Sequence, residues 1–305
     1  MSKKLILAGG TGNIGRLIID RYRELNWHIV VLTRQQKQSD DRLVTYVCWD
    51  GESLAEWAAE LEGADTLINL SGKSIQCRFT AKNKELLLAS RLMPTRILGQ
   101  AIASLQAPPR LWINFSGISL FEGLDGHHDE DSNQVGTTFL SELTGKWEKT
   151  FFNADTPGTH KVCLRLSPVL SKDFGMFKEL YPLSKFGLAG KVGNGQQLVS
   201  WIHQDDLINM IHWIIGLPEP SLIYHACTKE PVANKIFMQK LQEVTGFPYE
   251  IPLPSPLAKI GAYFKGVESD MLLLSNPVYA KNASREGFIY RYADLRMALE
   301  NLVNK

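Results

Sequence analysis

A glycine turn between a strand and a helix is the stretch of this sequence whose residue types and spacing point most directly to chemistry. Residues 4–16 read KLILAGGTGNIGR, and the glycines fit both G-x-G-x-x-G and G-x-x-G-x-x-G. The apolar run predicts a buried strand, and apolar residues at helical spacing from Ile14 to Tyr22 predict a helix. Glycine lets the backbone approach an anion, toward which the first helical N–H groups point. We therefore predict a pyrophosphate site, or alternatively a βα turn without ligand, formed by Gly9, Thr11, Gly12, Asn13, Ile14 and Gly15.

The end of the second predicted strand indicates which dinucleotide the site prefers. The strand covers His28–Thr33, and Arg34 follows where NAD-binding proteins carry an acidic residue for the ribose 2′-hydroxyl. A guanidinium at this place can hold a 2′-phosphate through two parallel hydrogen bonds. Thr33 and Arg34 therefore predict NADP as the cofactor, with a solvated surface arginine as the alternative.

Two more strand ends supply predicted cofactor contacts. Asp50 follows a third strand over 43–48, where it would either meet the adenine amino group or form a turn. A fourth strand over 66–70 runs into Leu70, Ser71 and Gly72. Small residues there would let the central part of the cofactor approach the backbone.

Regular alternation of strands and helices predicts the fold class. Further strands are expected over 111–115, 162–166 and 222–226, and helices over 54–61, 83–105 (interrupted by Pro94), 138–152 and 234–244. This order predicts an α/β, doubly wound parallel sheet of the Rossmann type. We expect residues 1–250 to form the NADP-binding domain, with a substrate-side insertion at about 172–204. Residues 251–305 would form a small C-terminal lobe, with a strand over 288–292 and a helix over 295–303.

Composition excludes several classes of partner. The 305 residues include 33 basic and 32 acidic side chains, so no overall field attracts nucleic acid or anionic membrane. The four cysteines form no C-x-x-C pair, which is typical of free thiols in a reducing compartment. No apolar run is long enough to span a membrane, and the first strand leaves no room for a signal peptide. We therefore expect a cytoplasmic protein whose partner is a small-molecule substrate.

Several motifs together resemble the extended short-chain dehydrogenase/reductase superfamily, and more closely its atypical "epimerase family" branch. The matching stretches cover nearly the whole chain: GGTGNIG at 9–15, NLSG at 69–72, Ser90-Arg91, Trp147-Glu148, GNGQQ at 193–197, SWIH at 200–203 and Gly287-Phe288. The resemblance implies a Rossmann-type NADP-binding domain with a small C-terminal substrate domain. It also implies that Arg34 and Arg91 contact the cofactor.

The catalytic pattern of that superfamily is incomplete here. The resemblance implies that Ser116, after the fifth strand, binds the substrate oxygen beside a Tyr-x-x-x-Lys whose lysine lowers the tyrosine pKa. The next helix has no such motif in any register. Tyr181 and Lys185 have the spacing, but Pro182 would interrupt a helix and the place is wrong, so we interpret the match as coincidence. Ser116 is the one predicted catalytic residue, with a strand-end backbone hydrogen bond as its alternative.

Other polar clusters carry weaker predictions. The stretch HHDED at 127–131 has metal-binding residue types but not the spacing of a ligand set, so we predict a solvated loop and no metal site. His203 precedes a helix and is expected to have a structural role. Lys73 and Arg78 would face either an anionic substrate or solvent.

These features favour an NADP-dependent oxidoreductase or epimerase acting on a small polar substrate, such as a nucleotide sugar. The alternative is a non-catalytic NADP(H)-binding sensor or interaction protein that has lost the Tyr-x-x-x-Lys acid/base. A scaffold with a vestigial pocket, which would bind no nucleotide, is the third hypothesis.

Overall fold

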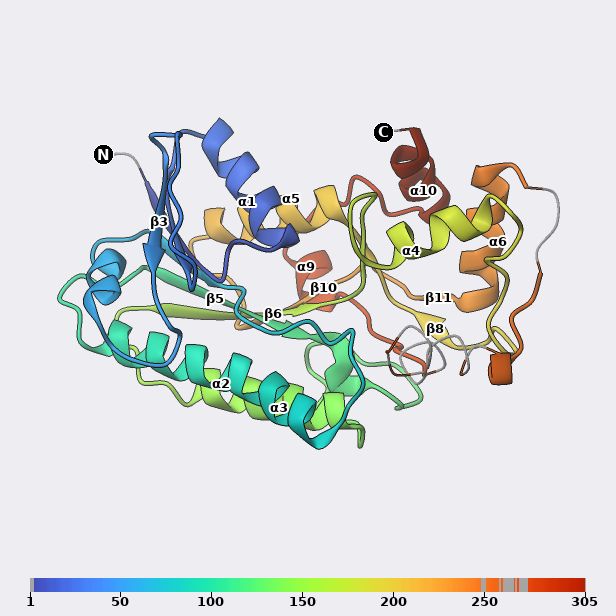
Figure 1. Ribbon diagram of the computed structural model, residues 1–305, viewed down its shortest axis with the longest axis horizontal. Coiled ribbons are helices and arrows are strands. Elements are labelled where there is room, and N and C mark those ends of the chain that lie inside the picture. The colour runs from blue at the N-terminus through green and yellow to red at the C-terminus, as the bar shows by residue number, and fades with distance from the viewer. Residues whose placement is uncertain are drawn as a thin grey trace.

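A seven-stranded parallel sheet forms the centre of the computed structural model, which describes residues 3–247, 251–257, 259, 266, 268 and 274–304. The strand order is β10-β6-β5-β4-β1-β2-β3, so the chain winds outward from β1 in both directions. The prediction of a doubly wound Rossmann-type sheet is confirmed (Figure 1). The strands are β1 (Lys4–Ala8), β2 (His28–Thr33), β3 (Val44–Cys48), β4 (Thr66–Asn69), β5 (Leu111–Gly117), β6 (His160–Leu166) and β10 (Ile223–Ala226).

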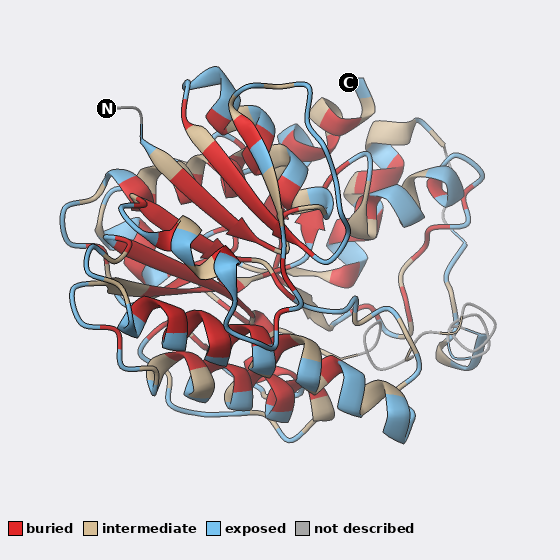
Figure 2. Cartoon of the chain, turned by 60° about the vertical axis from the view of Figure 1, so that its left-hand side comes forward, coloured by how far each residue is buried: buried red, intermediate tan, exposed pale blue. Residues whose placement is uncertain are grey.

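Helices cover both faces of the sheet because the strands are apolar on both sides. In β1, Leu5 and Leu7 pack into one buried cluster, whereas Ile6 and Ala8 pack into another. Figure 1 shows α1 and α5 on one face and α2 and α3 on the other, and Figure 2 shows the strands buried along most of their length. These helices are α1 (Asn13–Glu24), α2 (Ala81–Ala103), α3 (Phe139–Phe152) and α5 (Gln204–Gly216).

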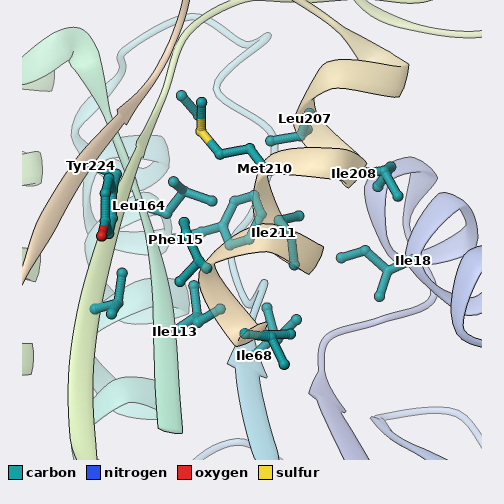
Figure 3. Packing of buried hydrophobic residues seen from close by; sticks show 14 of the residues in the cluster. Ile18, Ile68, Ile113, Phe115, Leu164, Leu207, Ile208, Met210, Ile211 and Tyr224 are labelled. Carbon is teal, nitrogen blue, oxygen red and sulfur yellow. The ribbon is translucent and has the colours of Figure 1, made fainter. Parts of the chain in front are cut away.

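The larger cluster fixes α5 and α1 against one face of the sheet (Figure 3). Side chains at alternate strand positions meet one stripe of α5. A buried side chain of this size contributes about 1.5–3 kcal/mol, so this face supplies much of the stability. The residues labelled in Figure 3 are Ile18, Ile68, Ile113, Phe115, Leu164, Leu207, Ile208, Met210, Ile211 and Tyr224.

The expected interruption of the second long helix at Pro94 is wrong. Proline removes a helical N–H and usually kinks or ends a helix, yet α2 continues through it. Pro94 is buried against Gly51, where an added Cβ would lie only 3.3 Å from the proline Cγ. Tertiary packing of the ring therefore offsets the lost backbone hydrogen bond.

A third apolar cluster lies beyond the sheet and joins α4, α6 and α10. Two short strand pairs, β8 with β11 and β7 with β9, lie in the same half of the chain. The predicted boundary at residues 250 and 251 stays a prediction, and residues 248–250 lie outside the described part. The elements are β7 (Val169–Leu170), α4 (Gly175–Ser184), β8 (Leu198–Val199), β9 (Ile202–His203), β11 (Val232–Ala233), α6 (Asn234–Thr245), α9 (Lys281–Arg285) and α10 (Leu295–Asn304).

The strand expected over 288–292 does not form. This stretch is held instead by side chains from elsewhere: the buried Asp206 carboxylate accepts the N–H groups of Arg291 and Tyr292, at 2.8 and 2.9 Å. Tyr290 donates its hydroxyl to the Cys227 carbonyl at 2.8 Å. Two of the backbone N–H groups that a strand would pair are therefore satisfied by one aspartate, and the Phe288 N–H donates to the Ala283 carbonyl at 2.8 Å. None of the described helices is long and apolar enough to cross a membrane.

We predict that Asp206→Ala destabilises the protein by about 2 kcal/mol, because two hydrogen bonds to a buried carboxylate are lost. Urea unfolding followed by circular dichroism measures this loss. Asp205→Ala is the matched control, since that neighbouring side chain is partly exposed. Equal urea unfolding midpoints for the two variants would contradict the stabilising role of the Asp206 hydrogen bonds.

Candidate functional site

Three glycines shape the turn after β1, each for a different steric reason. Gly9 has φ +74°, a conformation that favours glycine. A Cβ added to Gly10 would lie 2.7 Å from the Leu7 Cβ, and one added to Gly15 would lie 2.0 Å from the Gly10 carbonyl oxygen. The turn therefore closes tightly onto the first turn of α1, as a dinucleotide-binding turn does.

The start of α1 offers hydrogen-bond donors without a partner. Gly12 is the N-cap residue and supplies no side-chain cap, and a Cβ built there meets nothing within 4 Å. The first N–H groups of a helix have no intrahelical acceptor. Across the turn, the Ser71 hydroxyl is buried without a hydrogen-bond partner, and an added Gly9 Cβ would lie 3.1 Å from it. Open backbone donors and an unpaired buried hydroxyl fit an anionic group such as a pyrophosphate.

A cavity of about 580 Å³ extends from this turn along the carboxyl ends of the strands. It brings together ten of the residues predicted from sequence: Gly9, Gly12, Asn13, Ile14, Gly15, Leu70, Ser71, Gly72, Arg91 and Ser116. Thr11, Thr33, Arg34 and Asp50 do not line it. The last three of these lie at or just after the carboxyl ends of β2 and β3, which continue the same edge of the sheet.

Arg91 brings a buried positive charge to the cavity wall. Its guanidinium donates to the carbonyls of Leu87 and Lys73, at 3.1 and 2.9 Å, and its centre lies 5.3 Å from the Trp147 ring. No carboxylate of the described chain pairs with it. Burial lowers the pKa of Arg91 to about 10, so the side chain stays charged at neutral pH. An unpaired buried cation favours an anionic ligand.

A network of uncharged side chains ties the glycine-turn side of the cavity to the Ser116 side. Asn69, at the end of β4, donates to Asn114 of β5 at 2.7 Å and to Thr95 of α2 at 3.1 Å. Its oxygen accepts the Ser71 N–H at 3.0 Å. Trp147 of α3 donates to the same Thr95 hydroxyl at 2.9 Å. Two strand ends and two helices are thereby held in one arrangement.

Ser116 does not bond backbone at the strand end, so that alternative is wrong. Its hydroxyl donates to the buried Glu148 carboxylate at 2.7 Å, and Arg165 binds Glu148 through two 2.8 Å hydrogen bonds. Burial opposes the charge of Arg165, but Glu148 raises its pKa. Because the serine proton is given to Glu148, the serine oxygen can accept a hydrogen bond from a ligand in the cavity.

The polar chain continues behind Arg165. Burial, together with Arg165, lowers the pKa of His225 to about 3, so this imidazole is neutral. Its Nε2 accepts from Arg165 at 3.2 Å and its Nδ1 donates to the Tyr279 carbonyl at 2.9 Å. Sequence reasoning missed the roles of Glu148 and Arg165. The available signal was a charged residue inside the apolar strand sequence VCLRL.

Among the described residues that line the cavity, the superfamily's Tyr-x-x-x-Lys has no counterpart. Leu140 and Thr144 line the wall in its place, and the Thr144 hydroxyl lies 2.9 Å from that of Ser119. Tyr181 stacks on Phe177 with ring centroids 5.2 Å apart and is not a lining residue. The expectation that Pro182 interrupts a helix there is wrong, because α4 includes it.

Two other predicted positions have local structural partners. Asp50 is exposed and accepts the N–H groups of Glu52 and Ser53, at 2.8 and 2.9 Å, which lowers its pKa. This geometry favours the turn-forming interpretation over an adenine contact. Lys73 lines the cavity, whereas Arg78 does not.

The prediction of a solvated loop at 127–131 is wrong for His128 and Glu130, which are buried and have structural partners. No group of His, Cys, Asp or Glu in the described residues could hold a metal ion. Glu130 accepts the N–H groups of His225 and Lys281, each at 2.9 Å, while burial raises its pKa. His203 accepts the Asp205 N–H at 3.1 Å and so caps α5, as expected.

Comparison with known proteins identifies the family. The model of the NAD dependent epimerase/dehydratase family matches residues 5–226, and the chain belongs to this family. Epimerase family protein SH2119 of Staphylococcus haemolyticus is 28% identical over 303 residues, 99% of each chain. This confirms the resemblance inferred from the motifs.

Solved structures share the fold over the whole chain. The crystal structure of human epimerase family protein SDR39U1 (isoform 2) with NADPH has a TM-score of 0.88 at 24% identity, covering 99% of both chains. MoeE5 in complex with UDP-glucuronic acid and NAD has a TM-score of 0.77 at 18% identity, covering 99% of this chain and 98% of MoeE5. The Rossmann-like architecture is therefore common to all three.

We predict that Glu148→Ala destabilises the protein by about 3–5 kcal/mol, because it leaves the buried Arg165 charge uncompensated. Guanidinium chloride unfolding measures the change. Glu142→Ala on the same helix is the control, since its ion pair with Lys146 is exposed and contributes little. A Glu148→Ala midpoint equal to that of the control would refute the buried pair.

Proposed function

We propose that this protein is an NADP-dependent oxidoreductase or epimerase of the atypical short-chain type, acting on a small polar substrate such as a nucleotide sugar. The observation that carries the proposal is a set of groups around one turn that have no anionic partner in the described chain: the α1 N–H donors, the Ser71 hydroxyl and the Arg91 cation. Each is stabilised by an anion. Membership of the NAD dependent epimerase/dehydratase family supports the same cofactor class.

Preference for NADP over NAD rests on Arg34. It is exposed directly after β2, and within the described residues it makes no hydrogen bond or ion pair. A free guanidinium at this position suits a 2′-phosphate, and no acidic residue stands there to select the 2′-hydroxyl. The NADPH named with the human epimerase family structure agrees with this preference.

NADP, when bound, supplies the hydride donor or acceptor for a carbinol or carbonyl carbon. The protein's part is to bind and orient the substrate. Ser116 would accept a hydrogen bond from a substrate hydroxyl, because Glu148 holds the serine proton. Leu140, Leu143 and Phe174 give the cavity an apolar wall that excludes water.

A non-catalytic NADP(H)-binding sensor or interaction protein is the second candidate. The specific observation in its favour is that Leu140 and Thr144 line the wall in place of the tyrosine and lysine. Both candidates require nucleotide binding, whereas a scaffold with a vestigial pocket would bind none. A cytoplasmic location and a small-molecule partner also stay as proposals.

Titration of intrinsic or NADPH fluorescence with wild type and Arg34→Ala tests the cofactor. We expect the variant to lose about tenfold to a hundredfold in NADPH affinity, because a charged hydrogen bond is worth roughly 1.5–3 kcal/mol. NADH binding would change little. Arg42→Ala, which removes another exposed arginine between β2 and β3, serves as the charge control.

Equal losses for NADPH and NADH in Arg34→Ala would overturn the 2′-phosphate assignment. No binding of either nucleotide by wild type would overturn both candidates and favour the vestigial pocket.

A further inference from the structure

The turn that follows α4 exposes large apolar side chains at one place on the surface. Leu183, Phe186, Leu188 and Ile251 are exposed by 41%, 69%, 51% and 54%. The Leu188 N–H donates to the Leu183 carbonyl at 3.0 Å. The Ile251 N–H donates to the Gly187 carbonyl at 2.8 Å, which places Ile251 beside this turn. Single exposed apolar residues are ordinary, whereas a contiguous group marks an interaction surface. We refer to the four as the apolar turn.

Three lysines lie close to the apolar turn. Lys185 is exposed within it. Lys191 follows along the chain, and its carbonyl accepts the Leu253 N–H at 2.9 Å, near the isoleucine of the turn. Lys235 of α6 lies beside Lys191, because a Cβ added to Gly195 would be 2.9 Å and 3.1 Å from their respective Cβ atoms. The apolar turn therefore has a basic margin.

The positive charge of this margin is not compensated nearby. Lys240, further along α6, pairs with Glu243 at 2.8 Å, whereas none of the three lysines forms an ion pair within the described part of the chain. Residues 180–204 include no acidic side chain. Because the whole chain carries 33 basic and 32 acidic residues, the excess of positive charge here is local.

An anionic lipid surface matches both features of this region. Lysines are attracted by acidic headgroups, and exposed apolar side chains enter the boundary between headgroups and acyl chains. These two signals together give stable peripheral binding, which neither gives alone. A second copy of this chain matches less well, because a two-fold contact would place the same unpaired lysines opposite one another.

We infer that the apolar turn is a docking surface for an anionic lipid bilayer. Phe186, the most exposed of its side chains, enters the headgroup layer, and the three lysines contact lipid phosphates. The surface lies at the C-terminal end of α4, whereas Phe174 and Gly175 at the other end line the cavity. The 10 residues of α4 span about 15 Å, so docking holds the cavity at roughly that distance from the apolar turn.

Co-sedimentation with lipid vesicles tests the docking. Wild type should bind vesicles that contain phosphatidylglycerol at least about tenfold more tightly than vesicles of phosphatidylcholine alone, because three lysines act together. Raising the salt concentration should weaken the binding. No binding to either kind of vesicle, or equal binding to both, would overturn the inference.

Phe186→Ser should weaken binding to the anionic vesicles by about tenfold or more, because the largest apolar side chain of the surface is lost. Ile289→Ser is the matched control. Ile289 is 85% exposed, but its neighbours Phe288 and Tyr290 belong to the cluster that packs against α5. Both side chains are exposed, so neither change should lower the thermal unfolding midpoint. Binding by Phe186→Ser equal to that of the control would overturn the inference.

Lys185→Glu tests the contribution of charge and should also weaken binding by about tenfold. Lys82→Glu makes the same change in net charge at an exposed residue of α2, which Figure 1 shows well away from α4. This control should bind within about twofold of wild type. Equal losses in the two variants would show that binding follows net charge alone and would overturn the docking surface.

Sedimentation velocity without lipid distinguishes a bilayer from a second copy of the chain. Wild type and Phe186→Ser should have the same oligomeric state. A wild-type dimer that Phe186→Ser dissociates would assign the apolar turn to a second copy and overturn the inference. Nucleotide takes no part in these measurements, so their outcome is independent of whether the proposed function holds.

Discussion

One buried carboxamide, that of Asn69, fixes the relative positions of the groups that make up the site. It holds the Ser71 backbone on the glycine-turn side and Asn114, two residues before Ser116, on the other. It also donates to the hydroxyl of Thr95 in α2, and this hydroxyl donates in turn to the Arg91 carbonyl at 2.7 Å. Strand ends in a parallel sheet are held in register only up to their last pair. Beyond the last pair, the Asn69 amide holds the residues that follow β4 in place relative to β5.

The sheet and the glycine turn were readable from the sequence because each follows from local rules. Strand β1 has apolar residues facing both sides, as a strand buried on two faces must. Gly15 was predictable because a dinucleotide turn needs close approach there, and the structure leaves no room for a Cβ. These signals depend on residues a few positions apart.

The features missed from sequence depend on partners far away in the chain. Pro94 continues a helix because Gly51 accommodates its ring. The expected strand over 288–292 does not form, and Asp206, more than eighty positions earlier, binds the N–H groups of Arg291 and Tyr292 instead. The pairing of Glu148 with Arg165 and Ser116 could not be read from spacing, since a motif match names residue types and not their contacts. Asp50 is the opposite case, because its partners are the N–H groups of Glu52 and Ser53, close by in the sequence, and its turn-forming role could be predicted from local preferences.

Glu130 has a consequence for the order in which the molecule can assemble. Its carboxylate joins backbone groups 95 and 151 residues further along the chain. A chain emerging from the ribosome can thus form β1, the glycine turn and Ser71 long before Lys281 is synthesised. Asn276 comes nearly as late. The glycine-turn part of the cavity has all its residues early, whereas the lining is completed only when Asn276, about thirty residues from the end, joins it through contacts of long sequence separation that form slowly.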